Sequence, residues 1–456
     1  MIVMKFGGTS VGNTDAVKRL IDIVKSRLSK SPVVVLSAVS KATDTLHSIA
    51  ELAASGELAQ AKKLLGELKT RHLKMCLELV GEKSERYVPL TEKISGYFSE
   101  LTDMVKGVNL LSELSDRSLA KIITFGELLS SSIINEALNE GGVKCNFIDA
   151  RDFMYTDGNY LKGEPDIELI KEKTPDVINK NRKGFDAVIT QGFISNNKDK
   201  VTTSLGRGGS DYSASLIGMA IGAKEIEIWT DVDGVHTADP RKVQNTKSVS
   251  VMTFEEAAEL AYFGAKVLHP STIQPAVEKN IPVRILNSMS PESPGTLVVR
   301  EDKTKEEGVR SISCKENITV LNIFSTKMLN SYGFLHNLFE VFDKHHTSVD
   351  LITTSEVNVS LTIDNDEHLD DIVNDISVFS KVSVDRDKSL VCVVGKDLKN
   401  TKGVAKRIFG AAGDYNITMI SQGASAINIS FVVDRNDLNN VLQSLHDEFF
   451  ETNIQK

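Results

Sequence analysis

Two glycine-rich segments carry the residues best suited to chemistry on a phosphate: Lys5-Phe-Gly-Gly-Thr-Ser-Val11 and Ser204-Leu-Gly-Arg-Gly-Gly-Ser-Asp-Tyr212. Backbone N–H groups of consecutive glycines, next to a helix N-terminus, bind phosphate oxygens. Lys5 adds a positive charge at the end of a strand pattern. Arg207 can hold a carboxylate or a phosphate through two parallel hydrogen bonds. Asp211, at the start of a helical pattern, could orient Lys5 or a metal-bound phosphate.

Each of these segments alone has a simpler interpretation. A Gly-Gly pair is often an ordinary strand-to-helix turn, and Asp211 could merely complement a helix dipole. The sequence contains neither the P-loop pattern nor the dinucleotide-binding fingerprint. Two such loops in one domain are much less expected by chance, so together they indicate a nucleotide held from both sides.

A third segment, Trp229–Arg241, is dense in turn residues and follows a buried strand pattern. A surface loop would have the same punctuation. In open α/β sheets, however, ligands bind beyond the carboxyl ends of the strands. Thr230 and Asp231 could therefore contact a ribose or a base, and Arg241 a phosphate.

Three weaker candidates lie elsewhere. The hydroxyl-rich stretch Ser37–Asp44 follows a second buried strand, and Glu127 follows an apolar helix face. Lys266 closes a helical pattern. Each taken singly would more simply be a solvated side chain.

The elements that must position these residues follow from hydrophobic patterning. Short runs of β-branched and apolar residues predict buried strands of a mostly parallel sheet, because such strands are covered on both faces. Amphipathic patterns predict helices between them, and about residues 45–138 read as a helical excursion that carries substrate contacts. The fold class is α/β of the doubly wound kind. The predicted strands are 2–6, 32–36, 187–190, 225–230 and 283–286, and two of the predicted helices are 16–28 and 210–221.

Composition narrows the class of protein. The chain has 456 residues and a net charge of −9, with 41% hydrophobic residues, which excludes disorder and disfavours nucleic-acid binding. No apolar run is long enough to span a membrane, and the N-terminus does not resemble a secretion signal. Four scattered cysteines indicate a reducing compartment, so we expect a cytoplasmic protein.

The C-terminal third repeats itself. Ser355–Asp364 and Ser425–Asp434 match at an offset of 70 residues, and Gly333 and Gly403 keep this offset. Each copy predicts a small ferredoxin-like α+β module. The Pro-punctuated, polar stretch 287–305 predicts a linker. We therefore expect a catalytic domain over 1–300, a first module over 310–385 that residues 440–456 could complete, and a second module over 386–440.

The chain resembles the aspartokinases. Lys5–Val11, Gly206–Asp211, Trp229–Arg241 and Phe263–Pro270 occur in the order that is typical of that family, and the resemblance covers essentially the whole chain. It implies an amino-acid-kinase domain, with a mostly parallel open sheet between helices, followed by two ACT modules (βαββαβ). It also implies transfer of the ATP γ-phosphoryl group to the β-carboxylate of L-aspartate, giving 4-phospho-L-aspartate for lysine, methionine and threonine biosynthesis.

The resemblance assigns roles to individual residues. Lys5 would stabilise the transferring phosphoryl group, Gly7 and Gly8 would bind phosphate oxygens, and Asp211 would organise the lysines. Mg²⁺ would bridge the phosphates, and no protein ligand for it is identified. The substrate pocket would comprise Ser37, Thr43, Glu127, Arg207 and Ser210, with Arg207 on a carboxylate and Glu127 on the ammonium. The nucleotide-binding positions match Lys5, Gly7, Gly8, Thr230, Asp231, His236, Arg241 and Lys266. His236 stands where the family commonly has Tyr.

The first C-terminal module resembles the effector site of lysine-inhibited, single-function aspartokinases. By that match L-lysine would be surrounded by Met328, Ser331, Phe334, Leu335, Ser348, Val349, Asp350, Ser355 and Glu356. Asp350 and Glu356 would face its ammonium. The alternative is that this module serves only in dimerisation.

Partners and competing functions follow from the same resemblance. We expect a homodimer formed through the ACT modules, with a tetramer as a further option. Another amino-acid kinase of the same fold, directed at glutamate, is the alternative enzyme. A non-catalytic amino-acid sensor is the alternative outside catalysis, although the intact Lys5, Arg207, Asp211 and Lys266 argue against it.

Overall fold

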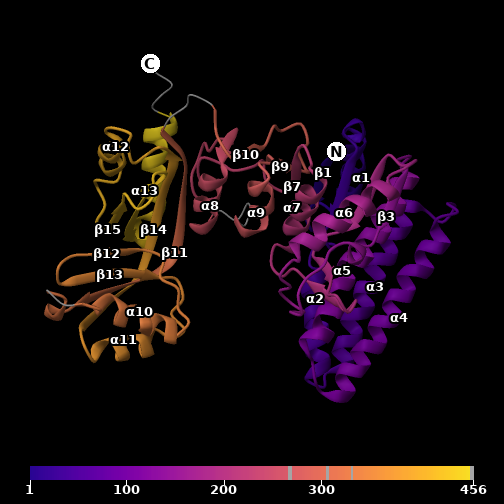
Figure 1. Ribbon diagram of the computed structural model, residues 1–456, viewed down its shortest axis with the longest axis horizontal. Helices are drawn as coiled ribbons and strands as arrows, with labels where there is room; N and C mark the ends of the chain where they lie inside the picture. Colours follow the sequence, from indigo (N-terminus) through magenta and orange to yellow (C-terminus); the bar gives the residue numbers. More distant parts are fainter. Residues whose placement is uncertain (265–269, 304–307, 330–331, 452–456) are drawn as a thin grey trace. The chain divides into compact units, whose positions relative to one another are not determined.

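The computed structural model describes residues 1–264, 270–303, 308–329 and 332–451 (Figure 1). The chain forms two compact units. The first comprises Met1–Gly234 and His269–Glu301, and the second comprises Val235–Leu268 and Asp302–Lys456. No helix in the described part of the chain combines the length and the apolar character needed to cross a membrane.

The first unit is built on a mostly parallel sheet. Six neighbouring parallel strands follow the order β3-β4-β2-β1-β7-β9, and β10 joins β9 antiparallel. Its strands are β1 (Ile2–Phe6), β2 (Pro32–Leu36), β3 (Cys145–Ile148), β4 (Ala187–Gln191), β7 (Ile226–Thr230), β9 (Val283–Asn287) and β10 (Thr296–Val299), and a separate hairpin is formed by β5 (Ile194–Asn196) and β6 (Thr202–Ser204).

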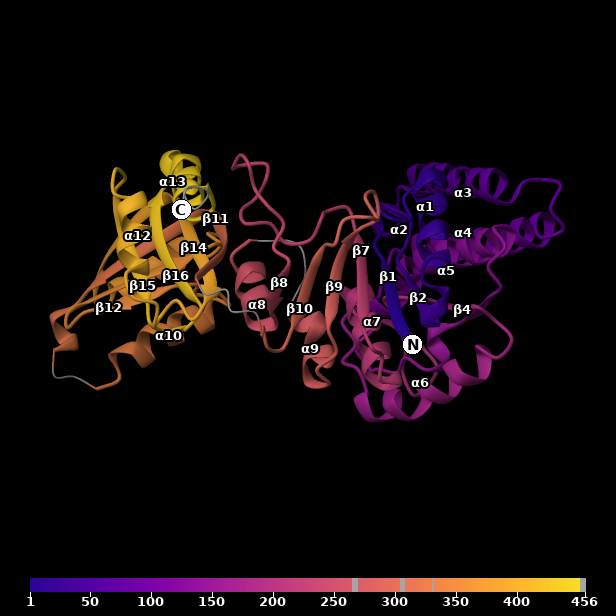
Figure 2. The ribbon, with the colours of Figure 1, turned by 90° about the horizontal axis from the view of Figure 1, so that it is seen from above.

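Helices cover both faces of this sheet. Figure 2 shows α6 and α7 on one face and α1 with the α2–α5 bundle on the other. Strands β1, β2 and β4 are buried along their whole length for this reason. The helices are α1 (Thr14–Lys25), α2 (Ala42–Ala54), α3 (Leu58–Val80), α4 (Tyr87–Leu111), α5 (Asp116–Glu140), α6 (Ile167–Asn181), α7 (Gly209–Ile221) and α9 (Pro270–Glu278), with 3-10 turns at Leu28–Lys30 and Ala150–Asp152.

The predicted fold class is confirmed. The strands predicted at 2–6 and 32–36 have the bounds of β1 and β2, and the other three differ by at most one residue at an end. The predicted helical excursion consists of four helices, α2 to α5. Helix α5 is buried over most of its length because it lies between the sheet and the other three helices.

The second unit contains a six-stranded antiparallel sheet, in the order β12-β13-β11-β14-β16-β15. Two of its strands are unusually long, β11 with 17 residues and β14 with 16. The elements are β8 (Val251–Thr253), α8 (Phe254–Tyr262), β11 (Gly308–Phe324), α10 (Phe334–Lys344), β12 (Ile352–Thr354), β13 (Asn358–Ile363), α11 (Leu369–Ser377), β14 (Lys381–Lys396), α12 (Val404–Ala411), β15 (Ile417–Gln422), β16 (Asn428–Asp434) and α13 (Leu438–His446), with 3-10 turns at Thr326–Met328 and Arg435–Asp437 and a π-helical turn at Asp447–Glu451.

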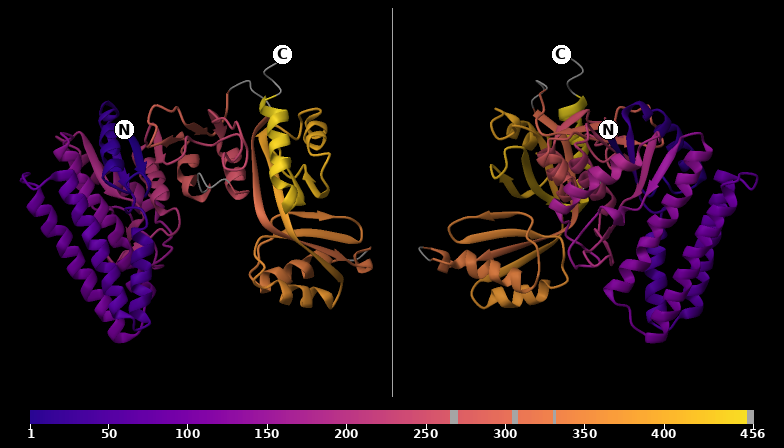
Figure 3. Two further views of the ribbon diagram at one scale, coloured as in Figure 1. Left: turned by 180° about the vertical axis from the view of Figure 1, so that it is seen from behind. Right: turned by 45° about the vertical axis from the view of Figure 1, so that its right-hand side comes forward.

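The two long strands run through both repeated modules. Near one end of β11, Ile323 pairs with Val359 of β13, and this half of the sheet packs on α10 and α11. Near the other end, Ile312 pairs with Val393 of β14, and that half packs on α12 and α13. Figure 3 shows the two helix pairs, in orange and in yellow, on separate parts of the sheet.

The order of the modules along the chain differs from the sequence-based boundaries. The first half of β11 belongs to the core of the second module, so the first module is inserted into the second. Helix α13 also packs in the second module's core, whereas residues 440–456 were expected to complete the first. Residues 452–456 of that stretch lie outside the described part.

Residues 235–264 also differ from the expectation of one domain over 1–300. Ala238 and Val243 are buried in the core of the second module beside Ile312. The turn-rich loop that holds Ala238 and Val243 gives no periodic signal, so the sequence did not reveal this packing.

We predict that Gly395→Ala destabilises the second unit. A Cβ at Gly395 would lie 2.2 Å from the carbonyl oxygen of Gly308 on the neighbouring strand. Overpacking of this kind costs about 1–3 kcal/mol. The control is Gly410→Ala in α12, where a Cβ meets nothing within 4 Å and alanine should stabilise by up to about 1 kcal/mol. Thermal unfolding of the two variants checks this, and an equal shift in both would contradict it.

Candidate active site

The centre of the candidate site is an ion pair between Lys5 and Asp211. Lys5 lies in β1 and Asp211 in the first turn of α7, and Lys5 Nζ is 2.8 Å from Asp211 Oδ1. Their side chains are only 10% and 19% exposed. The structure therefore brings together the two residues that the glycine-rich segments singled out, and the carboxylate fixes the direction of the ammonium.

The loop after β1 is fastened to the strand that follows it in the sheet. The N–H of Gly7 donates to the carbonyl of Trp229 at 3.0 Å, and the hydroxyl of Ser10 donates to the same carbonyl at 3.2 Å. A Cβ at Gly8 would lie 3.3 Å from the carbonyl oxygen of Ala38, so glycine permits this close approach of the two loops. Ser10 also shares a hydrogen bond of 2.8 Å with Ser288, after β9. Loops that follow β1, β2 and β9 thus meet the end of β7 at one edge of the sheet.

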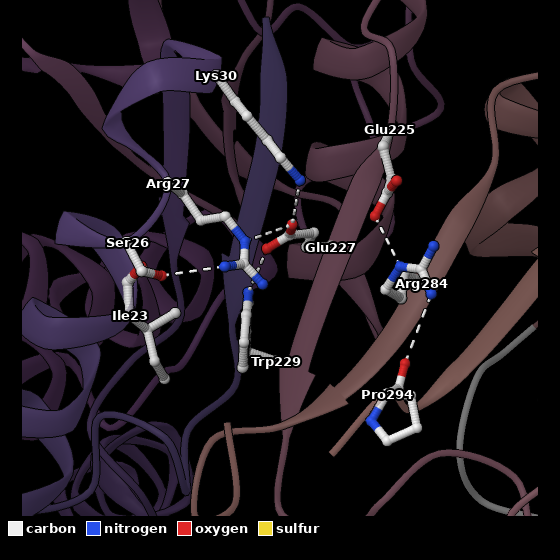
Figure 4. A network of polar contacts seen from close by, with 9 residues as sticks. All are labelled: Ile23, Ser26, Arg27, Lys30, Glu225, Glu227, Trp229, Arg284 and Pro294. Atoms are coloured by element: carbon white, nitrogen blue, oxygen red, sulfur yellow. Dashed lines mark hydrogen bonds and ion pairs between the residues drawn. The ribbon is translucent and has the colours of Figure 1, made fainter. Parts of the chain in front are cut away.

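A buried carboxylate in β7 supports this edge (Figure 4). Glu227 is 1% exposed and accepts from Arg27 Nε at 2.9 Å and from the indole N–H of Trp229 at 3.0 Å. The indole ring stacks on Phe6, with ring centroids 5.9 Å apart. Because Trp229 is held on its side chain, its carbonyl is fixed where the Gly7 loop needs an acceptor. In the same view, Arg284 bonds Glu225 at 2.9 Å.

The start of α7 is packed against the end of β4. A Cβ at Gly192 would lie 2.7 Å from Ser210, which leaves room only for glycine. Ser210 is half-buried in the first turn, and Arg207 is exposed in the loop before it. Ser210 and Asp211 therefore have fixed positions, while the Arg207 side chain faces solvent, where it can meet an anion.

Glu127 lies in a buried position on α5 beside the loop after β2. It is 4% exposed, and its Oε1 accepts from the N–H of Ala38 at 3.1 Å. Its Oε2 is buried and has no hydrogen-bond partner among the described residues. Burial raises the pKa of Glu127 to about 8, although the bond from Ala38 opposes this. A Cβ at Gly126 would lie 2.8 Å from that of Ala38 and 3.5 Å from Thr43 Oγ1.

These contacts place three predicted substrate residues around one loop. Ser37 precedes Ala38, and Thr43 lies in the first turn of α2, where its hydroxyl approaches the same Gly126 as Ala38 does. The hydroxyl of Ser130 donates to the Ser37 carbonyl at 2.8 Å. Glu127 carries little signal in the sequence, whereas its burial, with one oxygen unpartnered in the described part of the chain, suits a ligand for a cation.

The predicted nucleotide residues are divided between the two units. Thr230 ends β7 in the first unit, and its hydroxyl donates to Asp231 at 3.2 Å. His236 and Arg241 belong to the second unit, where His236 Nδ1 lies 3.4 Å from the Thr246 hydroxyl. Arg241 is paired with Asp239 through Nη2 at 2.8 Å. Lys266 lies outside the described residues.

Residues 1–287 match the amino acid kinase family, and residues 391–449 match an ACT domain. Lysine-sensitive aspartokinase 3 of Escherichia coli is 37% identical, with 99% of each chain covered. Chloroplastic aspartokinase 1 of Arabidopsis thaliana is 37% identical over 99% of this chain and 80% of its own length. The chain belongs to the aspartokinase family.

Solved structures agree with this assignment. The crystal structure of E. coli aspartokinase III in complex with aspartate and ADP matches with a TM-score of 0.81 and 37% identity, over 99% of this chain and 100% of that one. A second structure of that enzyme, in complex with lysine and aspartate, matches with a TM-score of 0.82 and the same identity and coverage. This aspartokinase is an enzyme, an ATP-dependent kinase that phosphorylates aspartate.

The effector residues expected for this aspartokinase lie in the first ACT module. Met328, Phe334 and Val349 are half-buried against its helices. Leu335, Ser348, Ser355 and Glu356 are exposed, and Ser331 lies outside the described residues.

Asp350 is the most constrained of the expected effector residues. Its side chain is 2% exposed, and its Oδ1 receives both Lys315 Nζ and the hydroxyl of Tyr262, each at 2.9 Å. Its Oδ2 is buried and has no partner in the described part of the chain. Lys315 also pairs with Asp364 at 2.5 Å.

Sequence reasoning missed several of these supporting residues. Ser10 lies inside the first glycine-rich segment and could have been singled out there. Glu227, Ser288, Lys315 and Tyr262 carry no local signal, because their partners are distant in sequence.

We predict that Glu127→Gln changes how stability depends on pH. The pKa of Glu127 in the fold, about 8, is above that of an unfolded glutamate, about 4.3. Between these values the unfolded chain loses a proton that the fold retains, so the native free energy of unfolding falls by up to about 1.4 kcal/mol per pH unit as pH rises. The variant lacks this loss and should gain stability relative to the native chain between pH 5 and pH 8.

Urea unfolding at these two pH values measures the effect. The control is Glu82→Gln, at an exposed position. Identical pH dependence in the Glu127 variant and the native chain would contradict the prediction.

Proposed function

We propose that this aspartokinase transfers the ATP γ-phosphoryl group to the β-carboxylate of L-aspartate, with Lys5 at the transferring group and Asp211 as the residue that orients Lys5. The Lys5–Asp211 ion pair carries the proposal, because it holds a cation in a mostly buried position at the sheet edge. Ligands of open α/β sheets bind at such edges.

The reaction explains why this residue type is needed. A carboxylate nucleophile is already anionic near pH 7, so it requires no general base. The obstacle is the repulsion between that carboxylate and the phosphates. A fixed ammonium and backbone N–H groups stabilise the charge that spreads over the phosphoryl oxygens in the transition state. The N–H of Gly7 donates to the Trp229 carbonyl, so Gly8 would supply such an N–H group next to Lys5, and the missing side chain of Gly7 would let a phosphate approach.

We assign the substrate pocket to Ser37, Thr43, Glu127, Arg207 and Ser210. Arg207 would hold a carboxylate of aspartate, and Glu127 its ammonium. The Oε2 of Glu127 is buried and has no hydrogen-bond partner among the residues that the structure describes, which supports this role, since a buried carboxylate oxygen gains most from a cation. An ammonium beside it favours the ionised form. Binding of aspartate near pH 7 should therefore release a proton from Glu127.

We assign the nucleotide to Lys5, Gly7, Gly8, Thr230, Asp231, His236, Arg241 and Lys266. His236, in place of the usual tyrosine, can donate or accept through its ring but offers no phenolic hydroxyl. Mg²⁺ belongs to the proposal because it would reduce the charge of the phosphates. Asp211 is engaged by Lys5, so Mg²⁺ would be held mainly by phosphate oxygens and water.

We further propose that L-lysine inhibits the enzyme by binding around Asp350 and Glu356. The supporting observation is the second oxygen of Asp350, buried and unpartnered among the described residues while the first holds Lys315. An ammonium would pair with it. The relative from E. coli carries lysine sensitivity in its name. The remaining ligands would be Met328, Ser331, Phe334, Leu335, Ser348, Val349 and Ser355.

The quaternary structure and the compartment complete the proposal. Two copies would associate through the ACT modules into a homodimer, and dimers could pair into tetramers. Cys76, Cys145, Cys314 and Cys392 are all free thiols, which suits the reducing cytoplasm.

We predict that Lys5→Ala lowers kcat by roughly a thousandfold or more, because it removes the cation that stabilises the transition state. A hydroxamate assay for the acyl phosphate, with aspartate and with glutamate as acceptors, measures this. The control is Lys25→Ala, at an exposed position at the end of α1. An unchanged kcat in the Lys5 variant would remove Lys5 from the mechanism.

We predict that Asp350→Ala relieves inhibition by L-lysine by about tenfold or more, since a hydrogen-bonded charge partner is lost. The KM for aspartate should change little. Inhibition curves with L-lysine and with L-threonine provide the measurement, and Asp343→Ala, on the exposed side of α10, is the control. Full sensitivity of the Asp350 variant would show that lysine binds elsewhere.

A further inference from the structure

The segment from Val235 to Gly264 is folded onto strand β11. At its beginning, the hydroxyl of Ser311 donates to the carbonyl of His236 at 2.7 Å, and the N–H of Ile312 donates to the carbonyl of Thr237 at 2.8 Å. The proposed nucleotide residue His236 is therefore bonded directly to β11.

The end of the segment packs closely against the same strand. Gly264 has a φ of +109°, and a Cβ there would lie 2.4 Å from the carbonyl oxygen of Cys314. Only glycine fits this conformation and this space. Both ends of the segment are thus attached to β11 between residues 311 and 314, next to the half of β11 that enters the first ACT module.

One side chain of the segment reaches the expected effector site. Tyr262, the last residue of α8, donates its hydroxyl to Asp350 Oδ1 at 2.9 Å. Lys315 Nζ bonds the same oxygen and lies 5.3 Å from the centre of the Tyr262 ring, within range of a cation–π interaction. The hydroxyl, the ammonium and the carboxylate form one cluster.

We propose that Tyr262 couples the effector site to the segment that carries His236 and Arg241, two of the proposed nucleotide residues. This inference rests on the proposed binding of L-lysine at Asp350. An ammonium placed on Oδ2 of Asp350 reduces the charge available to Oδ1, and so changes the strength of the Tyr262 bond. The effector then acts on α8 without touching it.

The coupling follows from linkage. The strength of the bond between Tyr262 and Asp350 depends on whether the effector is bound. Since Tyr262 belongs to α8, the conformation of α8 then depends on the effector as well. Lys315 still neutralises the negative charge of Asp350 when the Tyr262 bond is absent. Effector binding therefore does not require the tyrosine hydroxyl. The hydroxyl is needed only to pass the change on.

The test compares Tyr262→Phe with the full-length wild-type enzyme. Calorimetry gives the Kd of L-lysine, and the hydroxamate assay gives activity without lysine and at saturating lysine. We expect unchanged activity without lysine and a Kd within about threefold of wild type. The ratio of uninhibited to inhibited activity should fall by about tenfold. A tenfold change corresponds to the free energy that one hydrogen bond to a charged group contributes. The control is Tyr415→Phe, which removes a half-buried tyrosine hydroxyl from the same unit.

The outcomes separate this inference from the function on which it rests. Inhibition of the Tyr262 variant equal to that of wild type, with lysine bound, overturns the coupling role. Loss of lysine binding in the variant also overturns it, because Tyr262 would then belong to the binding site itself. Failure of the wild-type enzyme to bind lysine would instead refute the proposed effector.

Discussion

The proposed catalytic arrangement depends on keeping one cation in place with little water around it. Lys5 and Asp211 are both mostly buried and lie 2.8 Å apart, and removal of one partner of a buried pair costs about 3–5 kcal/mol because the other charge is left uncompensated. This energy makes the pair a constraint on the whole edge of the sheet. Strand β1 must end close to the start of α7. The glycine-rich loops beside them must lack bulky side chains, so that phosphates can approach.

The sheet satisfies that constraint through a second buried charge. Glu227 in β7 has both oxygens occupied, by Arg27 and by the Trp229 indole, so it is tolerated in a fully covered strand. Its effect reaches the site through the backbone, because the Trp229 carbonyl receives the N–H of Gly7. Glu227 thus holds the side chain of the residue whose carbonyl receives the first N–H of the loop after β1.

The sequence was sufficient to predict five strands of the first unit but not β3, β5, β6 or β10, and it predicts a site at the carboxyl edge of that sheet. Continuous β-branched runs identify covered parallel strands, and their carboxyl ends indicate where ligands bind. It was insufficient for contacts between distant residues, such as Ser10 with Ser288, which have no periodic signature. It also failed for β11 and β14, because strand patterning does not reveal that one strand serves two modules. The packing of residues 235–264 on β11 was missed because the loop at their start has no periodic apolar pattern.

Two carboxylates proposed to receive an amino-acid ammonium share one design. Glu127 and Asp350 are both buried, and each has one oxygen bonded and one without a partner among the described residues. They differ in whether a cation neutralises the carboxylate. Glu127 has no cation bonded to it in that part of the chain, so burial raises its pKa to about 8, and substrate must displace a proton. Asp350 is bonded to Lys315, so an effector finds a carboxylate that is already compensated. The substrate site should therefore be the more sensitive of the two to pH, because only there does binding exchange a proton for an ammonium.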